Sequence, residues 1–199
     1  MRIAFIGLGE AAGAFITGWG EDRASDIAAF DIKTMIPETA PEISDRAKAC
    51  GITHCITLQD AVSDADVVFS TVTADQAITA ARAAAPLMKQ GAYFLDMNSC
   101  APSSKQVSAE IMAEHNLRYV DVAVMEPVYP KQLDVPLLIS GDWSNDVSEL
   151  LSNLSLTFRI IDGAVGRASS IKMVRSIICL LYTSPSPRDL STSRMPSSA

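Results

Sequence analysis

The sequence predicts an α/β fold with a doubly wound, mainly parallel sheet, followed by the start of a truncated all-α second domain. Three observations support this prediction. Short β-rich runs alternate with helical patterns over residues 2–161, as expected for parallel strands joined by crossover helices. The first run leads directly into a glycine-rich loop. From residue 165 the alternation gives way to one helical pattern.

Five elements are predicted up to residue 72. Residues 2–6 form a short apolar strand that ends at the glycine loop, and residues 11–19 form an alanine-rich helix after it. Residues 27–30 are a second apolar strand, and residues 41–49 are a helix with a polar face. Residues 66–72 are so rich in β-branched side chains that we expect a buried strand.

The remaining elements continue the alternation. Residues 74–88 form a helix whose last turn is limited by Pro86, and residues 103–115 form a helix with an apolar face. The other predicted elements are strands at 92–95, 119–124, 136–140 and 157–161 and helices at 144–154 and 167–181.

The composition argues against several classes of function. The formal net charge is −7 and no stretch of the body is strongly basic, so nucleic acid and anionic membranes are poor partners. No apolar run approaches the roughly 20 residues needed to span a bilayer. The N-terminus runs straight into the glycine loop and has no signal-peptide pattern. We therefore expect a cytoplasmic protein.

The four cysteines, Cys50, Cys55, Cys100 and Cys179, show neither a CxxC pair nor a disulfide-like spacing. Cys50, His54 and Cys55 lie close in the sequence, so a metal site there is conceivable. However, their spacing does not fit zinc, and no second pair of ligands follows. We therefore expect reduced thiols and no metal.

Residues 7–12 match the G-x-G-x-x-(G/A) pattern of a dinucleotide-binding loop. The first glycine permits a tight turn, the second lets the backbone approach a pyrophosphate, and the third position must be small for helix–strand packing. The helix N-terminus adds free N–H groups and a partial positive charge. The predicted cofactor contacts in this loop are Gly7, Leu8, Gly9, Glu10, Ala11 and Ala12.

Asp31 ends the second predicted strand, close to the spacing of about 20 residues expected for a ribose-binding acid. A carboxylate there accepts hydrogen bonds from both ribose hydroxyls and repels a 2′-phosphate, which favours NAD over NADP. Lys33, two residues further on, leaves NADP possible. The alternative is a glycine turn with a surface aspartate. Residues 1–163 are therefore predicted to be an NAD(P)-binding Rossmann domain.

Two further strands end in polar residues, where open α/β sheets place their ligands. Thr71, Val72 and Thr73 end the strand at 66–72 and are predicted to line the ribose next to the nicotinamide, with simple packing as the alternative. Asn98 and Ser99 follow the strand at 92–95 and could hydrogen-bond a substrate hydroxyl or carboxylate as well as the cofactor. The alternative for these two is a turn with a helix cap.

Three segments resemble the β-hydroxyacid dehydrogenase family, which includes 6-phosphogluconate and 3-hydroxyisobutyrate dehydrogenases. Residues 96–102 (DMNSCAP) resemble its Asp-x-Ser-Thr-x-x-Pro motif, and residues 121–127 (DVAVMEP) resemble its Asp-Ala-Pro-Val-Ser-Gly-Gly segment. Residues 166–172 (GRASSIK) match the start of the helix that carries its catalytic lysine. The resemblance implies hydride transfer between a nicotinamide cofactor and a 3-hydroxy acid, with Lys172 as the catalytic lysine. It also implies a homodimer built through a large helical second domain.

The chain departs from the family at positions that contact substrate. The Ser-Thr pair is Asn98 and Ser99 here, and the Gly-Gly pair begins with Glu126. The asparagine one helical turn after the lysine is Arg175 or Ser176, so the usual substrates do not carry over. Glu126 faces either an amine or hydroxyl of an unusual substrate, or solvent. The candidate substrate contacts are Asn98, Ser99, Glu126 and Arg175.

Oxidation of a secondary alcohol needs a hydride acceptor, which the nicotinamide provides, and a base for the hydroxyl proton. Lys172 can be that base only if burial or nearby positive charge lowers its pKa. Arg175 lies on the same helix face, where it could lower that pKa and pair with a substrate carboxylate or phosphate. A lysine and an arginine on a solvated face are the alternative. Asn98 and Ser99 complete the predicted catalytic set.

We therefore expect an NAD(P)-dependent oxidoreductase for a 3-hydroxy acid, with a sugar acid as one possibility. A cofactor-binding module without turnover, for lack of the helical domain, is the alternative, and an imine or ketone reductase is a third. Residues 164–182 are expected to be the first helix of that truncated helical domain. Residues 183–199, rich in Ser, Thr, Pro and Arg, are expected to be a disordered, non-native tail.

Overall fold

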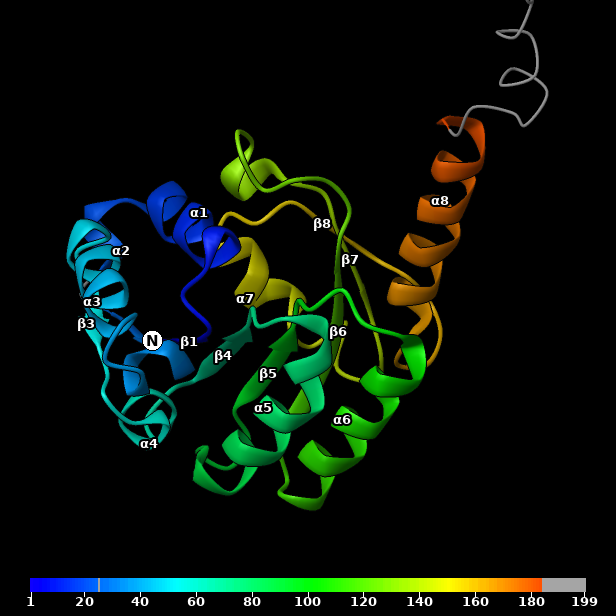
Figure 1. Cartoon of the computed structure of the whole chain (residues 1–199). Helices are drawn as coiled ribbons and strands as arrows, with labels where there is room; N and C mark the ends of the chain where they lie inside the picture. Colours follow the sequence, from blue (N-terminus) through cyan, green and yellow to red (C-terminus); the bar gives the residue numbers. More distant parts are fainter. Residues whose placement is uncertain (25, 184–199) are drawn as a thin grey trace, which may run out of the picture.

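The computed structural model describes residues 1–24 and 26–183. In this part of the chain, the strands form one sheet with the order β3-β2-β1-β4-β5-β6-β7-β8 (Figure 1). They are β1 (Ile3–Ile6), β2 (Ile27–Phe30), β3 (Thr53–His54), β4 (Val67–Ser70), β5 (Tyr93–Asp96), β6 (Arg118–Val124), β7 (Leu137–Ser140) and β8 (Phe158–Ile160). Strands β1 to β6 pair in parallel, and only the β6–β7 pair is antiparallel. The predicted α/β fold is confirmed.

Helices cover both faces of this sheet (Figure 1). They are α1 (Glu10–Trp19), α2 (Glu21–Ala24), α3 (Ala40–Ala49), α4 (Leu58–Val62), α5 (Ala77–Ala84), α6 (Pro102–Glu114), α7 (Ser148–Asn153) and α8 (Arg167–Thr183). Helices α1, α3 and α7 give buried side chains to one apolar cluster, and α4, α5 and α6 give them to the other.

The alternation of side chains along β1 explains the two clusters. Ile3 and Phe5 belong to one cluster, whereas Ala4 and Ile6 belong to the other, because successive side chains of a strand point to opposite faces. Every residue of β4 is also buried, which confirms the buried strand predicted within residues 66–72. Burial of both faces explains why these strands are continuously apolar instead of alternating.

Some elements differ from their predicted form. The helix expected at 74–88 is divided into a 3₁₀ turn, α5 and a second 3₁₀ turn (Ala85–Leu87) that contains Pro86. Proline has no N–H to continue the helical ladder. The helix expected at 144–154 begins only at Ser148. The short elements α2, β3 and α4 were not predicted, since two to five residues are too few to show a period.

The strand order places the candidate site. From β1 the chain moves outward to β2 and β3, and it then crosses back to β4 on the other side of β1. Ligands of open α/β sheets bind at such a switch point, beyond the carboxyl ends of the strands. The loops after β1, β4 and β5 therefore converge on one crevice.

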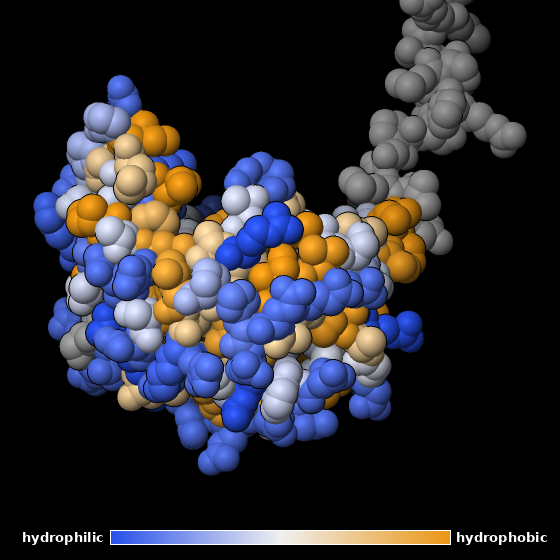
Figure 2. Space-filling model, turned by 90° about the horizontal axis from the view of Figure 1, so that it is seen from below, coloured by the Kyte–Doolittle hydropathy of each residue, from blue (hydrophilic) through white to orange (hydrophobic). Residues whose placement is uncertain are grey.

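Helix α8 lies beside β6 and β7, and its later turns extend beyond the body of the domain (Figure 1). Among the α8 side chains up to residue 179, the exposed large apolar ones are Met173, Val174, Ile177 and Ile178. Seen from below, the surface is hydrophilic over wide areas, with apolar patches that include one on α8 (Figure 2). Residues 184–199, nearly all of the predicted tail, lie outside the described residues. No helix of the described chain is both long and apolar enough to cross a membrane.

Candidate dinucleotide and catalytic site

The glycine loop forms a tight turn after β1, as the sequence predicts. Gly7 has a φ of +90°, and a Cβ built on it would lie 2.7 Å from the carbonyl oxygen of Thr71. A Cβ on Gly9, in contrast, would meet no atom within 4 Å. Ala12 is fully buried against the sheet. The first glycine is therefore needed for the fold itself, whereas the second leaves open space above the loop.

The N-terminus of α1 faces that open space. Gly9 is its N-cap, and no side chain caps the helix there. Its first-turn N–H groups and the positive end of its dipole can therefore serve an anionic group. This geometry fits the pyrophosphate of a dinucleotide.

Asp31 lies at the end of β2, next to the glycine loop. Its Oδ2 accepts a hydrogen bond from the backbone N–H of Leu8 at 2.8 Å, and its Oδ1 accepts one from that of Lys33 at 2.9 Å. Arg46 of α3 donates to the carbonyl oxygen of Leu8 at 2.5 Å and pairs with Glu42. Sequence reasoning missed Arg46, because nothing in the sequence places it near the loop.

A cleft of about 530 Å³ begins at the glycine loop and extends to α8. Nine of the predicted site residues line it, namely Glu10, Ala11, Thr71, Val72, Thr73, Asn98, Ser99, Glu126 and Lys172. The apolar wall was not predicted and consists of Ala74, Met97, Val124, Pro127 and Val128. A second cavity of about 180 Å³ lies on the α8 side and shares Asn98, Ser99 and Lys172. The fold thus brings together residues from five separate segments.

Lys172 and Ser99 meet where the loop after β5 approaches α8. The ammonium group of Lys172 donates to Ser99 Oγ at 2.7 Å. Burial lowers the pKa of Lys172 below its ordinary value of 10.5, and the positive charge of Lys105 lowers it further. Arg175, expected to cause this effect, instead donates to the carbonyl oxygen of Met125 at 3.0 Å. Sequence reasoning thus anticipated the direction of the shift but named the wrong cation.

Asn98 is held with a fixed orientation. Its Nδ2 donates to Ser70 Oγ at 3.0 Å and to Asp96 Oδ1 at 2.8 Å, and its backbone N–H also donates to that carboxylate. Turning the amide over would place an oxygen against a carboxylate. Asn98 Oδ1 is buried and has no hydrogen-bond partner among the described residues. It therefore offers an unused acceptor at a residue that lines both cavities.

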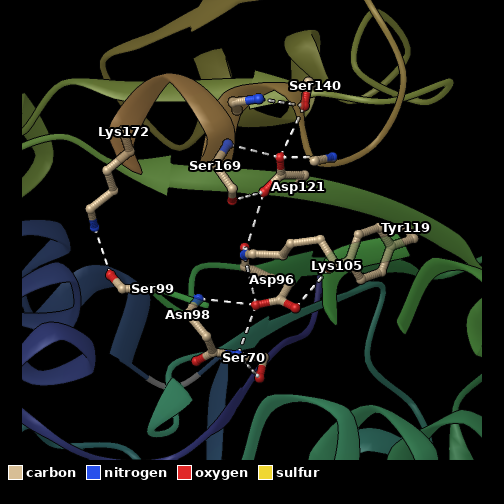
Figure 3. A network of polar contacts seen from close by, with 12 residues as sticks. Ser70, Asp96, Asn98, Ser99, Lys105, Tyr119, Asp121, Ser140, Ser169 and Lys172 are labelled. Carbon is tan, nitrogen blue, oxygen red and sulfur yellow. Dashed lines mark hydrogen bonds and ion pairs between the residues drawn. The ribbon is translucent and has the colours of Figure 1, made fainter. Parts of the chain in front are cut away.

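Asn98 belongs to a buried polar network that extends to the start of the helix that carries Lys172 (Figure 3). Lys105 of α6 approaches the carboxylates of Asp96 and Asp121 at 3.0 and 3.4 Å, and all three side chains are fully buried. Tyr119 donates to Asp96 Oδ2 at 2.7 Å. The sequence analysis includes Asp96 and Asp121 only as the first residues of two motifs and assigns them no role. It did not identify Lys105, because nothing in the sequence distinguishes this residue from an ordinary lysine on a helix.

Glu126 lines the cleft and pairs with Lys131 at 2.5 Å. The hydrogen bond from Lys131 is the main reason why the pKa of Glu126 lies below its ordinary value. Glu126 therefore faces a cation of its own chain, an arrangement that the sequence reasoning did not consider.

His54, which belongs to the conceivable metal site, contacts a threonine instead. Its Nε2 lies 3.0 Å from Thr34 Oγ1, and the neighbouring Cys50 and Cys55 are free thiols. Within the described residues, no group of three or more His, Cys, Asp or Glu side chains is arranged to hold a metal ion.

The strand order, the glycine loop and the open helix N-terminus together define a Rossmann-type dinucleotide-binding domain. The family model for the NAD-binding domain of 6-phosphogluconate dehydrogenase matches residues 2–126. The chain therefore belongs to this family, and its cofactor is NAD or NADP.

Comparison with individual proteins agrees with this placement. A conserved hypothetical protein from Sinorhizobium meliloti is 34% identical, with a TM-score of 0.83 over 89% of this chain and 59% of its own. An uncharacterised 28.5 kDa protein from Methanothermus fervidus is 26% identical over 89% of this chain and 64% of its own. The 3-hydroxyisobutyrate dehydrogenase of Mycobacterium tuberculosis, solved with L-serine, shares the fold, with a TM-score of 0.75 and 20% identity over 91% of this chain and 61% of its own. The chain thus spans about three fifths of the length of these proteins.

Proposed function

We propose that this chain carries the dinucleotide site and the catalytic lysine of an NAD(P)-dependent oxidoreductase that acts on a 3-hydroxy acid. The observation that carries the proposal is the contact between Lys172 and Ser99. It lies in the same cleft that begins at the glycine loop. A proton-transfer group of lowered pKa therefore lies in the cleft that fits the cofactor.

The cofactor part of the proposal rests on the fit of the cleft to a dinucleotide. The pyrophosphate takes the open space above Gly9 at the N-terminus of α1. The carboxylate of Asp31 faces the adenosine ribose, which favours NAD over NADP. Thr71, Val72, Thr73 and Asn98 line the nicotinamide side of the cleft. When bound, the nicotinamide supplies hydride acceptance or donation.

The role proposed for Lys172 follows from its surroundings. A general base must be neutral before it accepts a proton, and the lowered pKa increases the neutral fraction near neutral pH. The amine accepts the proton of the substrate hydroxyl in oxidation and returns it in reduction. Ser99, which already contacts Lys172, keeps this amine directed into the cleft.

Asn98 supports recognition of a hydrogen-bond donor on the substrate. Its free Oδ1 accepts from a hydroxyl group but repels a carboxylate, because both are electron-rich oxygens. The carboxylate of a 3-hydroxy acid is therefore assigned to Arg175, which lines neither cavity and donates to the carbonyl oxygen of Met125 in this structure, and not to Lys172, which must be neutral to act as a base. Of the two substrate groups that the sequence suggested for Asn98, we therefore propose the hydroxyl and not the carboxylate.

The domain limits remain part of the proposal. Residues 1–163 are assigned to the dinucleotide domain, which is consistent with a sheet that ends at Ile160. Residues 164–182 are assigned to the start of a helical domain, and they contain most of α8. We also propose that the protein forms a homodimer through that helical domain and that it is cytoplasmic.

The lysine role is tested with Lys172→Met, which removes the amine but keeps much of the side-chain length. Oxidation of a panel of 3-hydroxy acids is followed by formation of NADH, and cofactor affinity is measured by energy transfer from tryptophan to NADH. We expect turnover to fall by at least about 100-fold, the usual contribution of a general base, while NADH affinity changes little. In the unchanged protein, the oxidation rate rises with pH and levels off at a pH below 10.5, the ordinary lysine value.

Lys89→Met is the matched control, because Lys89 pairs with Asp66 on the surface away from the cleft. Retained turnover in Lys172→Met would refute the assigned role. Tight NADH binding without oxidation of any hydroxy acid or reduction of any imine by the unchanged protein would favour the cofactor-binding module instead.

A further inference from the structure

Lys105 is buried to an extent that is unusual for a lysine. Its side chain is fully buried, and its ammonium group donates to the carbonyl oxygen and to Oδ1 of Asp96 at 2.6 and 3.0 Å. The same ammonium lies 3.4 Å from Asp121 Oδ1. Lysines are almost never fully buried unless they are paired. The reaction proposed above makes no direct use of this residue.

The two carboxylates paired with Lys105 hold different parts of the site (Figure 3). Asp96 fixes the backbone and the side-chain amide of Asn98. Asp121 accepts hydrogen bonds from the N–H groups of Gly166 and Ser169, at 3.1 Å each, and from Ser169 Oγ at 2.6 Å. It therefore caps the N-terminus of α8, the helix that carries Lys172.

Charge balance makes the cation necessary. Without it, two carboxylates would share one dry region, where like charges repel strongly. The groups that interact with the cluster are Tyr119 from β6, Cys100 from the loop before α6 and Lys172 from α8. Tyr119 and Cys100 cannot supply a positive charge, and Lys105 is the cation that the described residues place within 4 Å of both carboxylates, so it offsets their mutual repulsion.

We propose that Lys105 is a positioning residue that joins the Asn98–Ser99 loop to the start of α8 and so sets the placement of Lys172 opposite Ser99. This inference rests on the proposed function only for the catalytic meaning of Lys172. The connection between the two elements stands on the contacts alone. Lys105 touches neither cleft and acts through Asp96 and Asp121.

The test uses Lys105→Met, with the surface variant Lys89→Met as its control. The first readout is amide hydrogen exchange at Gly166 and Ser169, measured by NMR. We expect exchange on the order of tenfold faster or more in Lys105→Met, because loss of one partner of a buried ion pair strongly destabilises what the pair holds. The control leaves exchange at these amides unchanged.

The second readout is the titration of the Lys172 ammonium, followed by NMR of isotope-labelled lysine side chains. Removal of the Lys105 charge, which lowers the pKa of Lys172, favours the charged form of Lys172. We therefore expect its titration to move to higher pH in Lys105→Met and to return towards the original pH in Lys105→Arg. A purely structural role that does not reach Lys172 predicts no such movement.

The two proposals fail in distinguishable ways. Unchanged exchange at Gly166 and Ser169, with an unchanged Lys172 titration, overturns the role of Lys105 whatever the enzyme does. If both readouts change but Lys172→Met still turns over substrate, the positioning role stands and the catalytic role falls. If Lys105→Met does not fold, the test is made by NMR on the unchanged protein. A lysine ammonium signal that is protected from solvent, and that is still present in Lys172→Arg, supports the buried contact of Lys105 with the two carboxylates. Absence of that signal overturns the proposal.

Discussion

The carboxylate of Asp31 combines a structural contact with a proposed specificity contact. One oxygen holds the N–H of Leu8 in the glycine loop and the other holds the N–H of Lys33. Each oxygen still has a lone pair for a ribose hydroxyl. A substitution that removes the whole side chain would therefore disturb the loop as well as the ribose contact.

Asp31→Asn keeps an oxygen that can accept from the N–H of Leu8 and removes the charge, while its amide nitrogen takes the place of the oxygen that accepts from Lys33. We expect NADH binding to weaken by roughly tenfold, the value of one charge-assisted hydrogen bond. NADPH binding should stay unchanged or improve, because repulsion of the 2′-phosphate is lost. Titrations followed by energy transfer from tryptophan measure both affinities, and equal weakening of both cofactors would contradict the ribose contact.

Lys172 shows why the cause of a pKa shift is harder to predict than its direction. Burial and a nearby cation were the two expected causes, and burial is indeed the larger. The cation is Lys105, which lies 67 positions earlier in the sequence numbering, and not Arg175 one turn away. Proximity along a helix was visible in the sequence, whereas proximity across α6 and α8 was not.

At the scale of elements, Trp19 joins α1 to the end of α7. Its indole N–H donates to the carbonyl oxygen of Leu154 at 2.7 Å, and its ring lies 6.0 Å from Phe5 and 5.8 Å from Phe69 between ring centroids. Helix α1 is therefore fixed against both the sheet and the next covering helix. Because α1 begins at the glycine loop, this packing also fixes the loop.

We expect Trp19→Phe to lower the free energy of unfolding by about 2 kcal/mol. The substitution leaves the Leu154 carbonyl without its donor and opens space around the smaller ring. Urea unfolding followed by far-ultraviolet circular dichroism measures the change. Trp143→Phe is the control, since Trp143 is partly exposed and its ring lies under the guanidinium of Arg118. A control loss as large as that of Trp19→Phe would contradict this account.

Helix α8 begins where two strands supply its cap. Asp121 of β6 accepts from Gly166 and Ser169, and Ser140 of β7 accepts from the N–H of Ala168. The cap residues are therefore distant in sequence from the helix. None of the four residues before residue 167 is Ser, Thr, Asp or Asn.

At the scale of the whole molecule, the buried network makes the free energy of unfolding fall as the pH becomes alkaline. Burial, and then the negative charge of Asp96, raise the pKa of Tyr119 well above its ordinary value of 10.0. In the unfolded chain, the Tyr119 hydroxyl loses its proton near the ordinary pKa of 10.0, whereas in the folded chain the hydroxyl stays protonated at that pH. The folded state then binds more protons, so stability is full below pH 10.0 and falls as the pH rises above it.

We expect the free energy of unfolding, measured in urea, to decrease between about pH 10 and pH 11. Tyr119→Phe should flatten this decrease, although its stability at neutral pH is lower because Asp96 loses a donor. Tyr129→Phe should keep the decrease, since Tyr129 is exposed. An equal slope in Tyr119→Phe and the unchanged protein would contradict the assignment.

Local sequence determined much of this protein. The glycine loop, Asp31 and the apolar runs of β1, β2, β4 and β5 were readable, because turn chemistry and side-chain period act over a few residues. The motif around Asn98 and the role of the lysine of α8 came instead from the resemblance to a known family. Local rules could not define β3 or α4, which are too short to carry a period. Strand β3 is held by pairing with β2, and α4 by packing against β1 and β2.

Only the tertiary structure decided how these pieces work together. It placed Arg46 on the glycine loop, Lys105 between Asp96 and Asp121, and Lys172 on Ser99. These contacts join residues far apart in the sequence and depend on strand order and helix crossing. Charge and burial act through space, so the roles of buried cations become visible only when the packed elements define which groups share one dry region.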